Sequence, residues 1–188
     1  MIEITSEQLE RVSLILSGIP GGAEKALSGA IRRANSTVRA ETVRQIAAVY
    51  NVTAQRARAE GNIHAIVQGG GGGVVGTVSF AGHKIPLYQF SVSPTVPVQR
   101  ATVRAASMRN HGMTPFAHAF IARMRSGHTG MFERETGSSF PVNEFMGLST
   151  AQMAGNEQVL EKVSDKAQET VNNRLEHEIT RILNGYGG

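Results

Sequence analysis

Two stripes of apolar residues at helical spacing stand near opposite ends of the sequence, and no such stripe lies between them. Residues that recur every three or four positions share one face of an α-helix, so each stripe predicts an amphipathic helix with a buried side. The two helices are expected from the Gly-rich break at 18–22 to about Tyr50, and from 147 to about 184. The stripes are Leu27, Ile31, Ala34, Val38, Ile46 and Val49, and Val159, Val163, Ala167, Val171, Leu175, Ile179 and Ile182.

Shorter helices are also predicted in the N-terminal third. A first helix is expected to run to about Leu16, because Thr5 and Gln8 form the Thr-x-x-Gln pair that is typical of a helix N-terminus. A short helix is expected from Thr53, whose hydroxyl can cap it, to the Gly-Asn pair at 61–62.

The middle of the chain carries the signals of β-structure. Four short segments rich in β-branched or aromatic residues are separated by Gly, Pro and Ser, and we interpret them as an antiparallel sheet. Pro94 and Pro97 make the piece 91–97 a poor central strand, so it is expected to be an edge strand or a crossing loop. The four predicted strands are 63–68, 74–80, 85–90 and 98–106.

The segment 119–142 predicts a β-hairpin with one apolar face. Phe120, Ala122 and Met124 alternate with Ile121 and two arginines, and a second alternating run begins at Met131 after a turn rich in Gly and Ser. The predicted fold class is therefore α+β, with a small antiparallel β-sheet packed against a long N-terminal helix and a long C-terminal helix. At 188 residues we expect one domain, 1–188, helical over 1–60, mainly strands and loops over 61–146, and ending in the helix 147–184.

Charge is distributed unevenly along the sequence. The formal net charge is +4, yet no carboxylate occurs from Gly61 through Phe132, whereas the C-terminal helix is acidic. The basic side chains favour contact with double-stranded DNA through its phosphates or, equally, docking on acidic surfaces of neighbouring subunits, including the C-terminal helix of another copy. The candidate DNA- or subunit-facing residues are Arg32, Arg33, Arg39, Arg44, Arg56, Arg58, Arg100, Arg104, Arg109, Arg123 and Arg125.

Two glycine-containing loops are candidates for subunit interfaces. Five consecutive glycines supply no side chains and are typical of a hairpin tip, and the Gly-Lys-Ser/Thr ending that a phosphate-binding P-loop needs does not follow them. The second loop is the turn 126–130, Ser-Gly-His-Thr-Gly, where a geometric role for the histidine is favoured. The candidate interface residues are Gly69, Gly70, Gly71, Gly72, Gly73, Gly127 and His128.

Signals for catalysis are weak. The histidines, His64, His83, His111, His118, His128 and His177, show no metal-ligand spacing, and the chain has no cysteine. No Gly-x-Ser-x-Gly segment is present, and the acid-free middle supplies no local carboxylate for acid and base chemistry. We therefore expect no enzyme activity, cofactor or metal. No apolar run of about 18 residues occurs, so no membrane association is expected either.

The order of these features resembles the phage minor tail protein Z family of tail completion proteins. The resemblance rests on Ala-Ile-Arg-Arg-Ala-Asn at 30–35, Ala-Phe-Ile-Ala at 119–122, Ser-Gly-His-Thr-Gly-Met-Phe-Glu-Arg at 126–134, Phe-Pro-Val at 140–142, Met153, and Leu-Glu-His-Glu-Ile at 175–179. It implies a structural virion protein of a tailed phage or prophage, acting in tail completion or head–tail joining at the head-proximal end of the tail.

The resemblance also implies partners. These are further copies in a homo-oligomeric, hexameric ring, other phage tail or neck proteins, and double-stranded DNA in the tail channel, with assembly in the host cytoplasm. Two alternatives stay open. One is a sequence-independent DNA-binding module that acts through the basic middle region, and the other is a hydrolase that acts on the cell wall or another polymer during entry.

Overall fold

The helices begin and end where the sequence provides caps and breaks. The computed structural model describes residues 6–70 and 73–185, so Thr5 of the expected capping pair lies outside the described residues. Gly21 turns the chain between the first two helices with a φ of +68°, a conformation that glycine adopts without steric cost. The N-terminal helices are α1 (Ser6–Ile15), α2 (Gly22–Val49) and α3 (Ala54–Glu60).

Each of the three N-terminal helices was predicted close to its observed bounds. The hydroxyl of Thr53 accepts a hydrogen bond from the backbone N–H of Arg56, so Thr53 is the N-cap of α3, and Gly61 is its C-cap. Of the predicted stripe on α2, Leu27, Ile31, Ala34 and Ile46 are buried, and Val38 and Val49 are half-buried.

The C-terminal helix differs from its prediction at the start. Instead of one helix from 147, the chain forms β10 (Met146–Ser149), then α4 (Thr150–Ala154), then α5 (Glu157–Leu183). Ser149 and Gln152 form a capping box that starts α4, and Gly155 ends it. The side-chain oxygen of Asn156 then accepts from the backbone N–H of Gln158 and starts a new helix. The predicted stripe on α5 is buried throughout.

The described strands form small sheets instead of one larger sheet. Two of the predicted strands are shorter than expected. The segment 85–90 passes into a 3-10 turn, η1 (Leu87–Gln89), after Pro86, and the segment 98–106 forms a strand only near its end. The strands before β10 are β1 (Asn62–Gly70), β2 (Gly73–Ala81), β3 (Lys84–Pro86), β4 (Ser91–Ser93), β5 (Val103–Ala106), β6 (Thr114–Phe116), β7 (Phe120–Arg123), β8 (Thr129–Arg134) and β9 (Val142–Glu144). The sheets have the strand orders β1-β2, β10-β3, β4-β5-β6 and β7-β8-β9.

The α+β class and the two long helices are confirmed. By its contacts the chain divides into two compact units. Unit 1 contains the described residues up to 42, Ile63–Ser79 and the described residues from 160 onward, and unit 2 contains Val43–Asn62 and Phe80–Val159. The expectation of a single domain stays a prediction.

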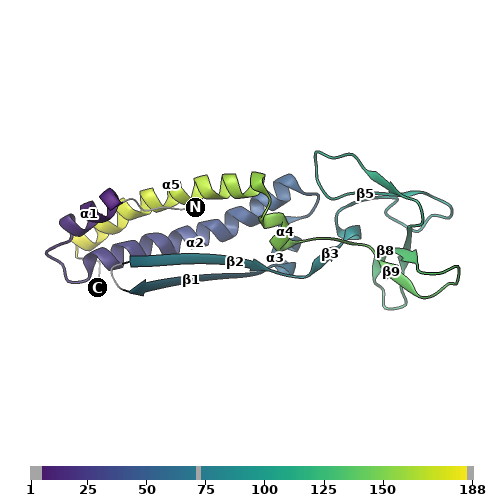
Figure 1. The fold of residues 1–188 in the computed structure, drawn as a ribbon, viewed down its shortest axis with the longest axis horizontal. Coiled ribbons are helices and arrows are strands. Elements are labelled where there is room, and N and C mark those ends of the chain that lie inside the picture. The colour runs from purple at the N-terminus through teal and green to yellow at the C-terminus, as the bar shows by residue number, and fades with distance from the viewer. Residues whose placement is uncertain (1–5, 71–72, 186–188) are drawn as a thin grey trace. The chain divides into compact units, whose positions relative to one another are not determined.

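Unit 1 is built on two long helices. In Figure 1 its parts of α2 and α5 run side by side, α1 lies along α5, and the strands β1 and β2, which point in opposite directions, run along α2. Apolar side chains from the three helices form one buried cluster, and Val74 of β2 packs against that cluster. The cluster is Val12, Leu16, Ala26, Leu27, Ala30, Leu175, Ile179 and Ile182.

Unit 2 holds the predicted hairpin. β7 and β8 pair antiparallel with Phe120 opposite Phe132 and Ile121 opposite Met131, so the hairpin prediction is confirmed. The predicted apolar face is wrong in detail, because Ile121 is buried while Phe120 is only half-buried. A third strand, β9, pairs with β8 and was not predicted. The expected edge role of 91–97 is confirmed, because β4 lies at the edge of its sheet.

Candidate nucleic-acid and subunit interface

The exposed side of α2 in unit 1 carries three arginines. Arg32 and Arg39 are seven residues apart, which returns almost to the same angle on a helix, and Arg33 is adjacent to Arg32. All three side chains are exposed, and none forms an ion pair with a carboxylate in the described part of the chain. A rigid helix therefore presents three cationic groups to solvent. We call Arg32, Arg33 and Arg39 the basic face.

An open depression adjoins the basic face. It has a volume of about 440 Å³ and is lined by Glu24, Lys25, Ser28, Arg32 and Arg181, among others. Arg181 is held by Glu178, with 2.8 Å between Nε and Oε2. The lining of the depression therefore contains both acidic and basic side chains. The sequence analysis did not include Lys25 among the candidate residues. Lys25 lies seven residues before Arg32 and therefore on the same side of α2.

Two of the candidate arginines in unit 2 have structural roles. The Arg109 Nε donates to the carbonyl oxygen of Ala47 at 2.9 Å, and its backbone N–H donates to that of Val49. These bonds satisfy carbonyls in the last turn of α2, which have no partner within the helix. Arg56 pairs with Glu60 at 3.1 Å and donates to the side chain of Gln89 at 3.0 Å. Each of these two side chains therefore uses part of its guanidinium group for contacts within unit 2.

The remaining candidate arginines of unit 2 are exposed but lie on different elements. Arg44 is on the last turns of α2, Arg58 is on α3, and Arg104 is on β5. Arg100 occupies the loop between β4 and β5 with a φ of 57°, while Arg123 and Arg125 stand at the end of β7 and in the turn after it. The acid-free stretch of sequence therefore does not form one cationic row. The basic face on α2 is the most regular arrangement among the candidates.

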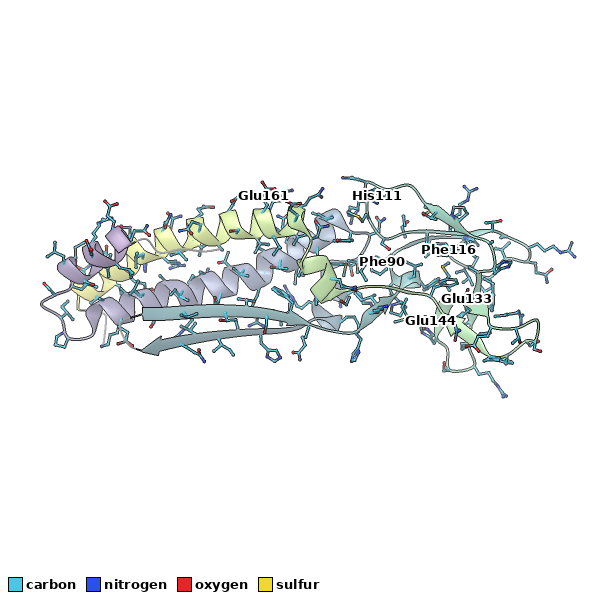
Figure 2. All side chains as sticks on the ribbon, viewed as in Figure 1. Phe90, His111, Phe116, Glu133, Glu144 and Glu161 are labelled. Atoms are coloured by element: carbon cyan, nitrogen blue, oxygen red, sulfur yellow. The ribbon has the colours of Figure 1, made fainter. Side chains whose placement is uncertain are left out.

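His128 serves the turn of the β7–β8 hairpin. Its carbonyl oxygen accepts from the backbone N–H of Met124 at 2.7 Å, and Gly127 beside it has a φ of +87°. The His128 Nε2 lies 2.8 Å from the Glu144 Oε1, and both side chains are partly exposed. Figure 2 labels Glu144 on β9 and Glu133 on the neighbouring strand β8, and in the strand register Glu144 stands opposite Phe132. The favoured geometric role fits these contacts, and Glu144 is a partner that the sequence did not indicate.

The described glycines of the run belong to the strands β1 and β2. Gly69 and Gly70 end β1, and Gly73 begins β2. Gly71 and Gly72 of the predicted interface loop lie outside the described residues. The element that follows the glycines is the strand β2, whereas a phosphate-binding loop is followed by a helix.

The exposed side of α5 in unit 1 is acidic only in part. Glu161, labelled in Figure 2, Asp165 and Glu169 recur every four residues and share one row. Lys162 and Lys166 stand beside that row, and the Lys166 Nζ lies 2.7 Å from the Glu169 Oε2. This mixture of signs makes α5 a weaker partner for the basic face of another copy than its carboxylates alone suggest.

Among the residues that the structure describes, no three His, Asp or Glu side chains are grouped so as to hold a metal ion. None of the described helices has both the length and the apolar character needed to span a membrane. Comparison with protein-family models found no match, and neither did comparisons with curated proteins and with solved structures. The resemblance to phage tail completion proteins therefore remains a hypothesis.

Proposed function

We propose that this chain is a structural virion protein of a tailed phage or prophage. It forms a ring of identical copies at the head-proximal end of the tail and completes tail assembly or head–tail joining. The ring contacts other tail or neck proteins and surrounds double-stranded DNA in the channel. The observation that carries this proposal is the basic face on α2, because three exposed arginines on one helix, with no carboxylate partner among the residues that the structure describes, suit a phosphate backbone.

The arrangement of unit 1 supports a scaffold role. A buried cluster fixes α1, α2 and α5 against one another, so the arginines are displayed by packed helices and not by a loop. Electrostatic contact with a polyanion depends on position and charge and needs no reactive group, so the exposed arginines of the basic face are sufficient for it.

Genetic deletion tests the proposal in the phage. Particles that lack this chain are expected to have filled heads and tails that fail to join, and the wild-type chain is expected among the peptides of purified tails. Intact, joined particles without this chain would contradict the proposal. A variant with Arg32, Arg33 and Arg39 all changed to Ala is expected to join heads and tails less efficiently than wild type.

The same observation favours a second candidate, an independent DNA-binding module. Such a module binds duplex DNA as a monomer and is absent from purified tails, whereas the tail protein is an oligomer and is present in them. Measuring the mass of the chain alone and with a DNA duplex separates the two functions.

A further inference from the structure

The β1–β2 hairpin lacks the devices that protect sheet edges. Its two strands, β1 and β2, are nine residues long each and contain no Lys, Arg, Asp, Glu or Pro. Edge strands in natural proteins are usually short, charged, interrupted by Pro or covered, because an open edge is a template for another strand. The two long, uncharged strands of this hairpin have outer edges that no other described strand pairs with.

Other edge strands of the same chain are protected. β6 contains Pro115, β7 ends at Arg123, and β9 ends at Glu144. These strands have only three or four residues, as does β4, which precedes Pro94. The contrast within one chain indicates that the open edges of β1 and β2 are a specific feature of this hairpin.

The hairpin is held against α2 from one side. The Asn35 Nδ2 donates to the carbonyl oxygen of Ile66 at 3.0 Å, and a side chain at Gly76 would overlap Ile31. Within the described residues β1 and β2 pair only with each other. Ile66 and Val75 remain 54% and 62% exposed, so both strands present apolar side chains to solvent.

We propose that β1 of one copy pairs with β2 of the next, so that the hairpins form a sheet that continues between subunits. The occupant is a second copy because β1 and β2 already accept each other as partners within one chain. Pairing between two different edges is heterologous, so it repeats from copy to copy and forms a ring when the rotation between successive copies closes. The inference rests on the proposed ring and names its subunit contact.

Disulfide trapping tests the pairing directly, because the chain has no cysteine of its own. One full-length protein carries His64→Cys on β1, and each of three others carries Val75→Cys, Thr77→Cys or Ser79→Cys on β2. Each replaced side chain is exposed. Because every protein has one cysteine, a disulfide must join two copies, and it forms only where the Cα atoms lie within about 7 Å.

The β1 variant is mixed in equal amounts with each β2 variant in turn and oxidised. Mass spectrometry then measures how much of each disulfide-linked dimer has formed. At least one mixture is expected to give the mixed β1–β2 disulfide in at least tenfold excess over either homodimer. The matched control is Leu160→Cys, an exposed position on α5, which is expected to give no such preference. A dominant β1–β1 homodimer, or no preferred disulfide in any mixture, would overturn the inference.

Charged substitutions give a second, independent measurement. Ile66→Lys and Val75→Lys are each expected to lower the assembled fraction at least tenfold, because a charge is a natural edge protector. Leu183→Lys, at a residue of similar exposure on α5, is expected to leave assembly unchanged. Circular dichroism confirms that each variant retains its helices.

The outcomes distinguish this inference from the proposed function. A ring that survives both lysine substitutions and yields no mixed disulfide overturns the strand pairing and leaves the tail role standing. A chain that stays monomeric also overturns the pairing, and its presence in or absence from purified tails then decides the proposed function separately.

Discussion

Asn35 of α2 and Ile66 of β1 are joined by a hydrogen bond from a buried amide to a backbone carbonyl oxygen, 3.0 Å long. The Asn35 side chain is only 6% exposed, so it is a polar group in an otherwise apolar stripe. Gly76 of β2 lies beside it and leaves the space through which the amide approaches. This bond links the hairpin to the helix.

Asn35→Ala is expected to destabilise the chain, because the Ile66 carbonyl loses its partner from α2. The expected loss in free energy of unfolding is about 1–3 kcal/mol. Urea denaturation measures that loss, and hydrogen exchange is expected to accelerate at the amides of β1. Ser36→Ala, at the exposed neighbouring position, is the control and should change neither. Unchanged exchange in β1 would mean that the bond does not hold the hairpin.

Gly76→Val is expected to displace the hairpin from α2. A Cβ at position 76 would overlap the Ile31 side chain, which is β-branched and has little freedom to move. Overpacking of this kind typically costs about 1–3 kcal/mol of stability. Thermal unfolding of this variant is compared with Thr77→Val, at an exposed position on the same strand. Equal melting temperatures for the two variants would contradict the observed contact.

Thr150→Val is expected to destabilise unit 2. The Thr150 hydroxyl is fully buried and donates to the Ala57 carbonyl oxygen of α3 at 3.0 Å. Valine keeps the shape but removes the donor, so a loss of about 1–2 kcal/mol is expected in the free energy of unfolding. The exposed Thr53→Ser substitution, which preserves a hydroxyl N-cap, serves as the control. A neutral Thr150→Val variant would show that this bond contributes nothing.

Glu144→Gln is expected to change stability by no more than about 1 kcal/mol. The His128–Glu144 pair is partly exposed, and such pairs contribute little in water. Gly127→Val is expected to cost more, because the φ of +87° at this turn is unfavourable for a β-branched residue. Equilibrium unfolding of both variants measures the two effects. The reverse order would indicate that the contact between His128 and Glu144, and not the turn geometry, is the important feature.

Replacing the basic face is expected to weaken duplex binding in a salt-dependent way. With Arg32, Arg33 and Arg39 changed to Ala, the slope of log affinity against log salt concentration should fall by up to about 3, since each phosphate contact contributes about 0.9. A triple variant of α5, Lys162, Lys166 and Arg174 to Ala, is the matched control. Equal slopes for both variants would show that the basic face does not contact DNA.

Helix positions could be predicted from the sequence because their signal is local. The stripes on α2 and α5 depend on residues a few positions apart, and Thr53 caps α3 from within the same segment. The break before α5 was missed because Gly155 and Asn156 are only two residues in a segment that otherwise has a helical pattern. A single glycine there ends one helix while the next asparagine caps another.

The sheets could not be assigned because their pairing is not local. β10 pairs with β3, with Met146 opposite Pro86, and nothing in either segment identifies the other. The role of Arg109 was missed for the same reason, because its acceptor is the carbonyl of Ala47. Asn35 did carry a signal, since a polar residue four positions after Ile31 falls on the apolar stripe.

Self-assembly is the central claim, and native mass spectrometry of the purified full-length chain tests it most directly. Six copies, each of 20.1 kDa, in one closed particle are the predicted result, with the particle lost in Ile66→Lys and Val75→Lys. A wild-type chain that remains a monomer at every concentration measured would contradict the account.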